Sequence, residues 1–177
     1  MRLEQKYFIP FIAVCGLLTL IVIIYGTVNY SEKQKVEFRE NISSVMIDTV
    51  SFDLFSLEER LVMEELKGNP TIIHFWTTWS DRSLQVNQFL DRYKRENPEL
   101  IVVAAIVRDG EEQVKEYLGQ QNHDFIIVQG TTFFQSLLIP GVPSQILVRR
   151  DGTLFDTQVG DDISTLETLL NSLLQDG

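Results

Sequence analysis

The chain has 177 residues, with 15 basic residues, 25 acidic residues and a single cysteine. One cysteine cannot form an internal disulfide, a CxxC redox pair or a cysteine-based zinc site. The net charge of −10 argues against binding to nucleic acid, which requires a basic face. The apolar fraction of 44% is enough for one packed domain of ordinary size with an appendage.

The appendage is a stretch of 25 residues without a charge, from Tyr7 to Ser31. Its most apolar part, residues 8–25, would extend over about 27 Å as a helix, close to the roughly 30 Å of a bilayer core. Tyrosines stand near both ends of the stretch, where interfacial aromatic residues anchor a span. We therefore expect residues 1–6 to form a short tail and residues 7–30 to form a transmembrane anchor.

Three other interpretations of this stretch fit less well. A cleaved signal peptide needs small residues at its cleavage site, and residues 25–29 (YGTVN) have no A-x-A pattern. A lipoprotein signal would end at its cysteine, yet ten largely apolar residues follow Cys15. A helix buried in a protein core is the remaining alternative, although a helix that is apolar on all faces suits lipid better.

The charges around the anchor do not decide its orientation, because basic and acidic residues are balanced in the segment that follows it. A short N-terminus ahead of a large domain favours a domain outside the cytoplasm, in the cell envelope. Residues 31–45 are polar and highly charged, and we expect them to form a stalk that continues the helix. Without the tail, 13 basic and 24 acidic residues remain, so the domain has a net charge of −11 and should avoid anionic membrane surfaces.

Residues 46–177 alternate between strand and helix patterns. Residues 45–55 are prone to form β-structure, and Ser56 with Glu59 forms a capping box that predicts a short helix. The continuous apolar runs 71–76 and 100–107 predict strands buried on both faces. Apolar spacing and turn signals predict helices and strands in the rest of the domain: helices over 83–96, 111–121, 132–138 and 164–174, and strands over 125–128, 145–149 and 153–159. The order βαβαβαββα predicts an α/β fold with a sheet covered by helices.

Four short motifs occur in order along this domain. They are KGNP at 67–70, FWTTWSDRS at 75–83, GVPS at 141–144 and the turn pair Asp151-Gly152. Together they resemble the lead-in to the first core strand, the F-W-A-T-W-C-x-x-C active-site segment, the cis-proline loop and the closing hairpin of thioredoxin-like proteins of the TlpA/ResA type. The resemblance covers about residues 46–174. It implies a thioredoxin-like fold, with a central mixed sheet flanked by helices, after one N-terminal transmembrane helix.

The departure from that family is that serine occupies both cysteine positions, as Ser80 and Ser83. Thiol–disulfide exchange requires a thiolate that attacks a disulfide sulfur, and a serine hydroxyl cannot replace it. A serine nucleophile would need a base, and neither His74, expected to face the core, nor His123, expected in a polar turn, has the spacing of a triad. Metal-ligating residues do not cluster at ligand spacing. We therefore expect no catalytic residue, no cofactor and no metal site.

The surface around the degenerate motif is the remaining candidate site. A serine at the start of a helix is a preferred N-cap, and an acidic residue after it suits the positive end of the helix dipole. The resemblance places Trp79 beside this helix start, makes Pro143 the cis proline, and offers the backbone of Val142 to an extended peptide. We take Trp76 as a core residue and Arg108 and Asp109 as solvated loop residues. The candidate positions are those of the degenerate motif and of the cis-proline loop: Trp79, Ser80, Asp81, Arg82, Ser83, Val142 and Pro143.

Three functional hypotheses follow. The first is a membrane-anchored, extracytoplasmic protein without redox cysteines that binds an envelope protein as a polypeptide-binding, scaffold or complex subunit. The second is a thiol–disulfide oxidoreductase, which holds only if Ser80 and Ser83 replace native cysteines. The third is a purely structural or small-ligand role in which the groove of the family is unused.

Overall fold

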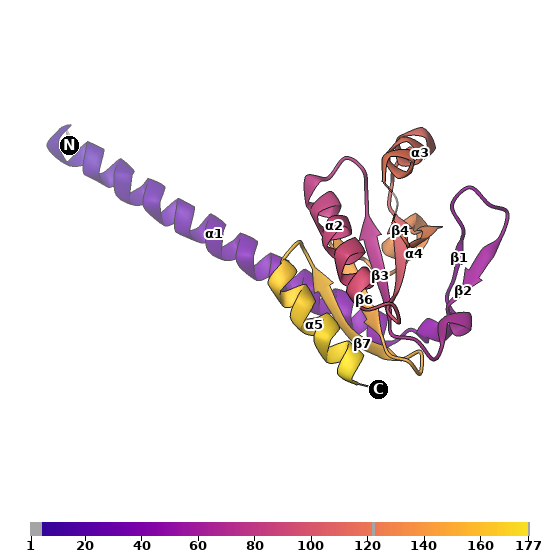
Figure 1. Ribbon diagram of the computed structural model, residues 1–177. Helices are drawn as coiled ribbons and strands as arrows, with labels where there is room; N and C mark the ends of the chain where they lie inside the picture. The colour runs from indigo at the N-terminus through magenta and orange to yellow at the C-terminus, as the bar shows by residue number, and fades with distance from the viewer. Residues whose placement is uncertain (1–4, 122, 177) are drawn as a thin grey trace.

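The computed structural model describes residues 5–121 and 123–176. Helix α1 (Gln5–Ser43) begins far from the folded domain and enters it at its C-terminal end (Figure 1). From Pro10 onward it is long and apolar enough to cross a membrane, and no residue of its most apolar stretch is buried against the domain. The expected anchor and the expected stalk are therefore parts of one continuous helix.

The centre of the domain is a five-stranded mixed sheet in the order β5-β4-β3-β6-β7. The strands β3, β4 and β5 are parallel, β6 is antiparallel to β3, and β7 is antiparallel to β6. The central strand β3 places Thr71 opposite Ile101 of β4 and Val148 of β6. The strand bounds are β3 (Thr71–Trp76), β4 (Ile101–Ile106), β5 (Ile126–Gln129), β6 (Ser144–Val148) and β7 (Leu154–Val159). The predicted α/β architecture with a central mixed sheet is confirmed.

Three helices cover one face of the sheet: α2 (Asp81–Glu96), α3 (Glu111–Gln120) and α5 (Ile163–Gln175). Alternate residues of a strand share a face, so Ile72 and Trp76 both point toward these helices: Ile72 packs with α2 and α5, and Trp76 packs with Val114 of α3. Asp162 caps the last helix by accepting hydrogen bonds from two backbone N–H groups of its first turn. The side chains of α2 and α5 that meet the sheet are fully or almost fully buried, as their helical spacing predicts: Val86, Phe89, Leu90, Tyr93, Leu166, Leu170 and Leu173.

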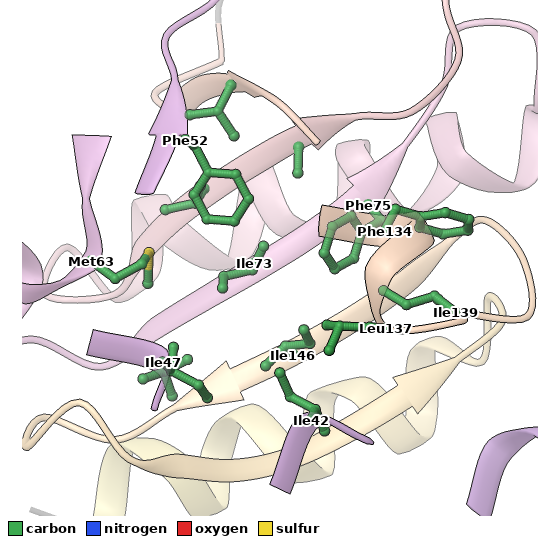
Figure 2. Packing of buried hydrophobic residues seen from close by; sticks show 14 of the residues in the cluster. Ile42, Ile47, Phe52, Met63, Ile73, Phe75, Phe134, Leu137, Ile139 and Ile146 are labelled. Carbon is green, nitrogen blue, oxygen red and sulfur yellow. The ribbon is translucent and has the colours of Figure 1, made fainter. Parts of the chain in front are cut away.

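The other face of the sheet is covered by short elements and by the end of α1. Phe75 meets Phe134 of the short helix α4 (Thr131–Ser136), with ring centroids 5.6 Å apart. Phe38 and Ile42 of α1 are fully buried in the same cluster. Figure 2 shows Ile42 pointing into this cluster, which also contains Leu137 and Ile146.

The stalk predicted over residues 31–45 is therefore not a free polar spacer, and its second half belongs to the core. Asn41 donates a hydrogen bond of 3.2 Å to the carbonyl of Leu137, and Arg39 lies 3.2 Å from a carboxylate oxygen of Asp156. The apolar side chains at positions 38 and 42 lie one helical turn apart on the face that these contacts hold against the sheet. The helix that could span a membrane is thus joined firmly to the domain.

The prediction of a short helix from the capping box at Ser56 is wrong, because residues 51–62 form a hairpin. Its strands are β1 (Ser51–Asp53) and β2 (Arg60–Val62), and Leu54 N–H donates to the Glu59 carbonyl across the turn. The paired strands bury Phe52 and Leu61 against the core. An isolated helical turn here would be costly to nucleate, so the hairpin is favoured. Two 3₁₀ turns flank the hairpin, η1 (Ile47–Thr49) and η2 (Met63–Leu66).

Candidate functional site

The two serines of the degenerate motif have different structural roles. Ser80 is the N-cap of α2, because the backbone N–H of Ser83 donates a hydrogen bond of 3.3 Å to its Oγ. The side chain of Ser83 is fully buried, and its hydroxyl has no hydrogen-bond partner within the part of the chain that the structure describes. Within that same part, neither hydroxyl hydrogen-bonds to a histidine or a carboxylate. The expected N-cap is present, and no base activates either hydroxyl.

The loop between β3 and α2 is held by Asp109, which the sequence predicts as a solvated loop residue. Thr77 and Thr78 donate hydroxyl hydrogen bonds of 2.9 and 3.0 Å to the Asp109 carboxylate, and the backbone N–H of Thr78 donates to it as well. The prediction for Asp109 is therefore wrong. Hydrogen bonds to a charged acceptor are stronger than neutral ones, so this carboxylate fixes the loop that leads to Trp79.

The two tryptophans of the motif face opposite environments. Trp76 is 1% exposed and packs its ring 5.1 Å from that of Tyr117, which confirms it as a core residue. Trp79 is 69% exposed at the end of the clamped loop. Asp81 and Arg82 are exposed in the first turn of α2, and the Arg82 guanidinium lies 3.8 Å from Asp161. The loop thus presents one large aromatic side chain to solvent beside a charged helix start.

A groove brings Trp79 together with the cis-proline loop. The Val142–Pro143 peptide bond is cis, Pro143 is buried and Val142 is half-buried. Trp79 and Val142 line the same groove, which has a volume of about 340 Å³. Among the described residues, Arg108 is its only charged lining residue, and the other walls are apolar or backbone: Val107, Phe134, Ile139, Pro140 and Gly141.

A second hollow of about 400 Å³ adjoins this groove, shares four of its lining residues and reaches α1. Arg108, Phe134, Ile139 and Pro140 line both hollows, and the second also has Gln34, Gln135 and Leu138 in its walls. We call the two hollows together the trough. Residues 134–140 were not predicted as site residues from the sequence. The apolar pair Ile139-Pro140 directly after a short helix is the only local signal, and it does not indicate exposure.

The two histidines lie on the α2 side of the sheet, away from the trough. His74 is fully buried on β3, and its Nδ1 lies 3.3 Å from Nε2 of Gln145 on β6. Burial lowers the pKa of His74 to about 3, so the imidazole is neutral at pH 7. The described residues contain no group of three or more His, Cys, Asp and Glu that could hold a metal ion.

His123 lies in the connection between α3 and β5, outside any helix or strand, where the sequence predicts a polar turn. Its side chain is 4% exposed and stacks on Phe125 with ring centroids 4.8 Å apart. Its Nε2 lies 3.0 Å from the Tyr117 hydroxyl, and its Nδ1 lies 3.4 Å from Asp91. The predicted turn does not indicate the burial of the ring, which depends on contacts with Phe125 and Tyr117. These contacts place the imidazole beside α3 and α2, where it does not form a triad with Ser80 or Ser83.

No family model matches the sequence, and no curated protein matches it. Many solved structures match the fold. A thiol:disulfide interchange protein of the thioredoxin family from Chlorobium tepidum matches with a TM-score of 0.64 and 16% identity, over 73% of this chain and 96% of that one. A secreted disulfide oxidoreductase of Mycobacterium tuberculosis matches with a TM-score of 0.59 and 18% identity, over 71% and 96%. StoA of Bacillus subtilis matches with a TM-score of 0.55 and 19% identity, over 70% and 98%.

At these identities the likeness establishes the fold alone. The one cysteine of this chain, Cys15, lies in α1 and not in the domain that matches these structures. The sheet order, the helices on both faces and the structural matches agree with each other. The domain of this chain therefore has a thioredoxin-like fold.

Proposed function

We propose that this protein is a membrane-anchored, extracytoplasmic, polypeptide-binding protein that uses the surface of a thioredoxin-like fold without thiol chemistry. The observation that carries the proposal is the open apolar groove between Trp79 and Val142, beside a motif that contains no thiol. A partner in the cell envelope would bind there as a scaffold client or as another subunit of a complex.

The groove has the features that recognition of an extended peptide needs. Trp79 offers a large aromatic surface at low entropic cost, because Asp109 holds the loop beneath it. Val142 precedes strand β6, and its peptide groups form no backbone hydrogen bond among the described residues. An extended segment could pair with those groups while its side chains fill the apolar walls.

The absence of exchange chemistry follows from the domain's composition. Residues 44–177 contain no sulfur nucleophile, since their only sulfur belongs to methionine. The hydroxyl of Ser80 caps a helix and that of Ser83 is buried, so neither is available to a substrate disulfide. Binding without turnover is the activity that remains for this surface.

Partner recovery from membranes tests the proposal. The full-length chain carrying Trp79→Ala should recover at least about tenfold less of its envelope partner than the unmodified chain, because truncating a tryptophan anchor typically costs 2 kcal/mol or more. Leu57→Ala is the matched control, since Leu57 is also exposed but lies on the distant β1–β2 hairpin. Equal recovery by both variants, with the fold intact by circular dichroism, would favour a purely structural or small-ligand role.

One observation keeps the oxidoreductase hypothesis as a second candidate. The Ser80 side chain accepts a hydrogen bond from the first turn of α2, and a thiol at such a helix start has a lowered pKa and is reactive. If the serines replace native cysteines, the double variant Ser80→Cys/Ser83→Cys should reduce insulin disulfides with added dithiothreitol. Activity no higher than that of the unmodified chain would exclude this candidate.

A further inference from the structure

The trough ends against the helix that could span a membrane. Gln34, Phe38 and Ile42 follow each other at successive turns of α1, and Phe38 and Ile42 are buried in the domain while Tyr30, one turn before Gln34, is 64% exposed. Gln34 forms part of the trough wall and donates a hydrogen bond of 3.2 Å to the Tyr30 hydroxyl. The next turn toward the N-terminus therefore rises directly from the rim of the trough.

This position sets how far the trough lies from a bilayer. Gln34 is one turn, about 6 Å, from Tyr30, which stands at the end of the uncharged stretch. The polar headgroup layer on each side of the hydrocarbon core is about 5–7 Å thick. Because α1 continues without a break into the core at Phe38 and Ile42, the trough is held close to the outer edge of the headgroup layer and does not swing on a flexible linker.

The lining of the trough has one uncompensated charge. Arg108 is exposed, and the structure places no carboxylate within ion-pairing distance of its guanidinium among residues 5–121 and 123–176. No acidic residue in the described part of the chain lines either hollow, although the domain as a whole has a net charge of −11. Leu138 stands beside Arg108 in the second hollow, 62% exposed and with a φ of 52°. Apolar walls around a single free cation complement an apolar segment with one carboxylate.

A protein segment fits this place better than the lipid surface does. The acidic domain is repelled by anionic headgroups, and the apolar residues of the trough form a concave surface that lipid tails do not fill from the headgroup level. A polypeptide emerging from the bilayer beside α1 would reach the trough within its first few residues, because an extended chain covers about 3.3 Å per residue.

We propose that the trough binds an extended, apolar segment of a membrane-embedded protein, next to one of its transmembrane spans, and that a carboxylate in this segment pairs with Arg108. This inference rests on the proposed function and specifies the class of partner. The segment runs from the α1 rim at Gln34 and Leu138 toward Val142 and Trp79.

Photocrosslinking in native membranes tests the inference with the full-length chain. A photoreactive phenylalanine analogue replaces Leu138 in one protein, Trp79 in a second and Leu57 in a third. We expect protein adducts from positions 138 and 79, and none from position 57. Mass spectrometry should place the position 138 crosslink within about ten residues of a transmembrane span, in a peptide that contains Asp or Glu.

The outcomes separate this inference from the proposed function. A soluble protein, a phospholipid or a second copy of this chain at position 138 overturns the inference. If position 79 then still captures a protein, the proposed function stands. The absence of any protein adduct at both positions overturns the inference and the proposed function together.

Charge substitution at Arg108 tests the pairing. Arg108→Glu should lower the adduct yield from position 138 at least about tenfold, because two like charges would meet in the trough, whereas Arg108→Lys should keep the yield within about threefold. The guanidinium of Arg108 forms no side-chain hydrogen bond among the described residues, so neither change removes a contact of the fold. Equal yields from the Glu and Lys variants would overturn the role of the carboxylate.

Discussion

The two faces of the central sheet close in different ways. On the face of Ile73 and Phe75, the core is a continuous aliphatic and aromatic cluster. Its buried hydroxyls, on Thr71 and Ser144, donate to nearby backbone carbonyls. On the α2 face, polar side chains are buried beneath the degenerate motif, and several of their atoms have no hydrogen-bond partner within the described chain: His74 Nε2, Ser83 Oγ, Asn87 Oδ1 and Gln145 Oε1.

The two faces therefore differ in what they contribute: the apolar face stabilises the fold, whereas the α2 face lies beneath the degenerate motif. The apolar face gains stability from burial, but it is complete only with Phe38 and Ile42 from α1. The α2 face is covered by helices of the domain itself, and it holds buried polar groups that lower stability where they are unpaired. The helix that could span the membrane is therefore also a structural part of the domain.

Removing the α1 side chain from the apolar face should have the largest effect. Phe38→Ala should lower the free energy of unfolding by about 3–5 kcal/mol, since Phe38 is fully buried and its loss leaves a cavity. Val36→Ala, at an exposed position of the same helix, should change it by less than about 0.5 kcal/mol. Urea unfolding of the detergent-solubilised chain measures both, and similar values for the two variants would mean that α1 does not complete the core.

Releasing the loop before Trp79 should have the next largest effect. Asp109→Ala should destabilise the protein by about 1.5–3 kcal/mol, because Thr77 and the Thr78 N–H lose a charged acceptor. Asp81→Ala removes an exposed carboxylate from the neighbouring helix start and should cost less than about 1 kcal/mol. If thermal unfolding gives the two variants the same stability, Asp109 does not clamp the loop.

On the α2 face, buried His74 should make the free energy of unfolding depend on pH. His74 has a pKa of about 3 when folded and about 6.5 when unfolded, so below pH 6.5 the unfolded chain takes up a proton that the folded chain does not. Stability from this group is complete above pH 6.5 and is lost as the pH falls toward 3. Between pH 7 and pH 5 the unmodified protein should lose about 2 kcal/mol more than His74→Gln. Other groups are the same in both proteins and cancel, so identical pH profiles would contradict a neutral buried His74.

Much of the fold could be predicted because its strongest signals are local. The apolar runs 71–76 and 100–107 consist almost entirely of β-branched, aliphatic and aromatic residues, and both form buried strands. The serine N-cap at Ser80 and the turn pair Asp151-Gly152 predict a helix start and a hairpin from a few neighbouring residues, and both are present. The groove beside Trp79 was expected only from the resemblance to a family.

The predictions of solvent exposure fail where a distant part of the chain determines whether a residue is buried. Phe38 and Ile42 lie in a charged segment, and their burial depends on a sheet that begins about thirty residues later, at Thr71. Asp109 follows the second core strand, and only the parallel pairing of β3 with β4 brings it to Thr77 and Thr78. Local polarity predicts a solvated residue in both cases, because sequence patterns do not show which element will cover it.

The smallest changes in stability should come from Ser80 and Ser83, the two serines at the cysteine positions of the thioredoxin-like motif, and they should differ between the two. Ser80→Ala removes the acceptor for the Ser83 N–H and should cost about 1 kcal/mol. Ser83→Ala removes a buried hydroxyl that has no partner in the described chain, so stability should stay the same or rise by up to about 1 kcal/mol. Denaturant unfolding of both variants measures the difference. A loss of 1 kcal/mol or more from Ser83→Ala would mean that this hydroxyl is bonded in the folded protein, and that the second serine position contributes to stability as the first one does.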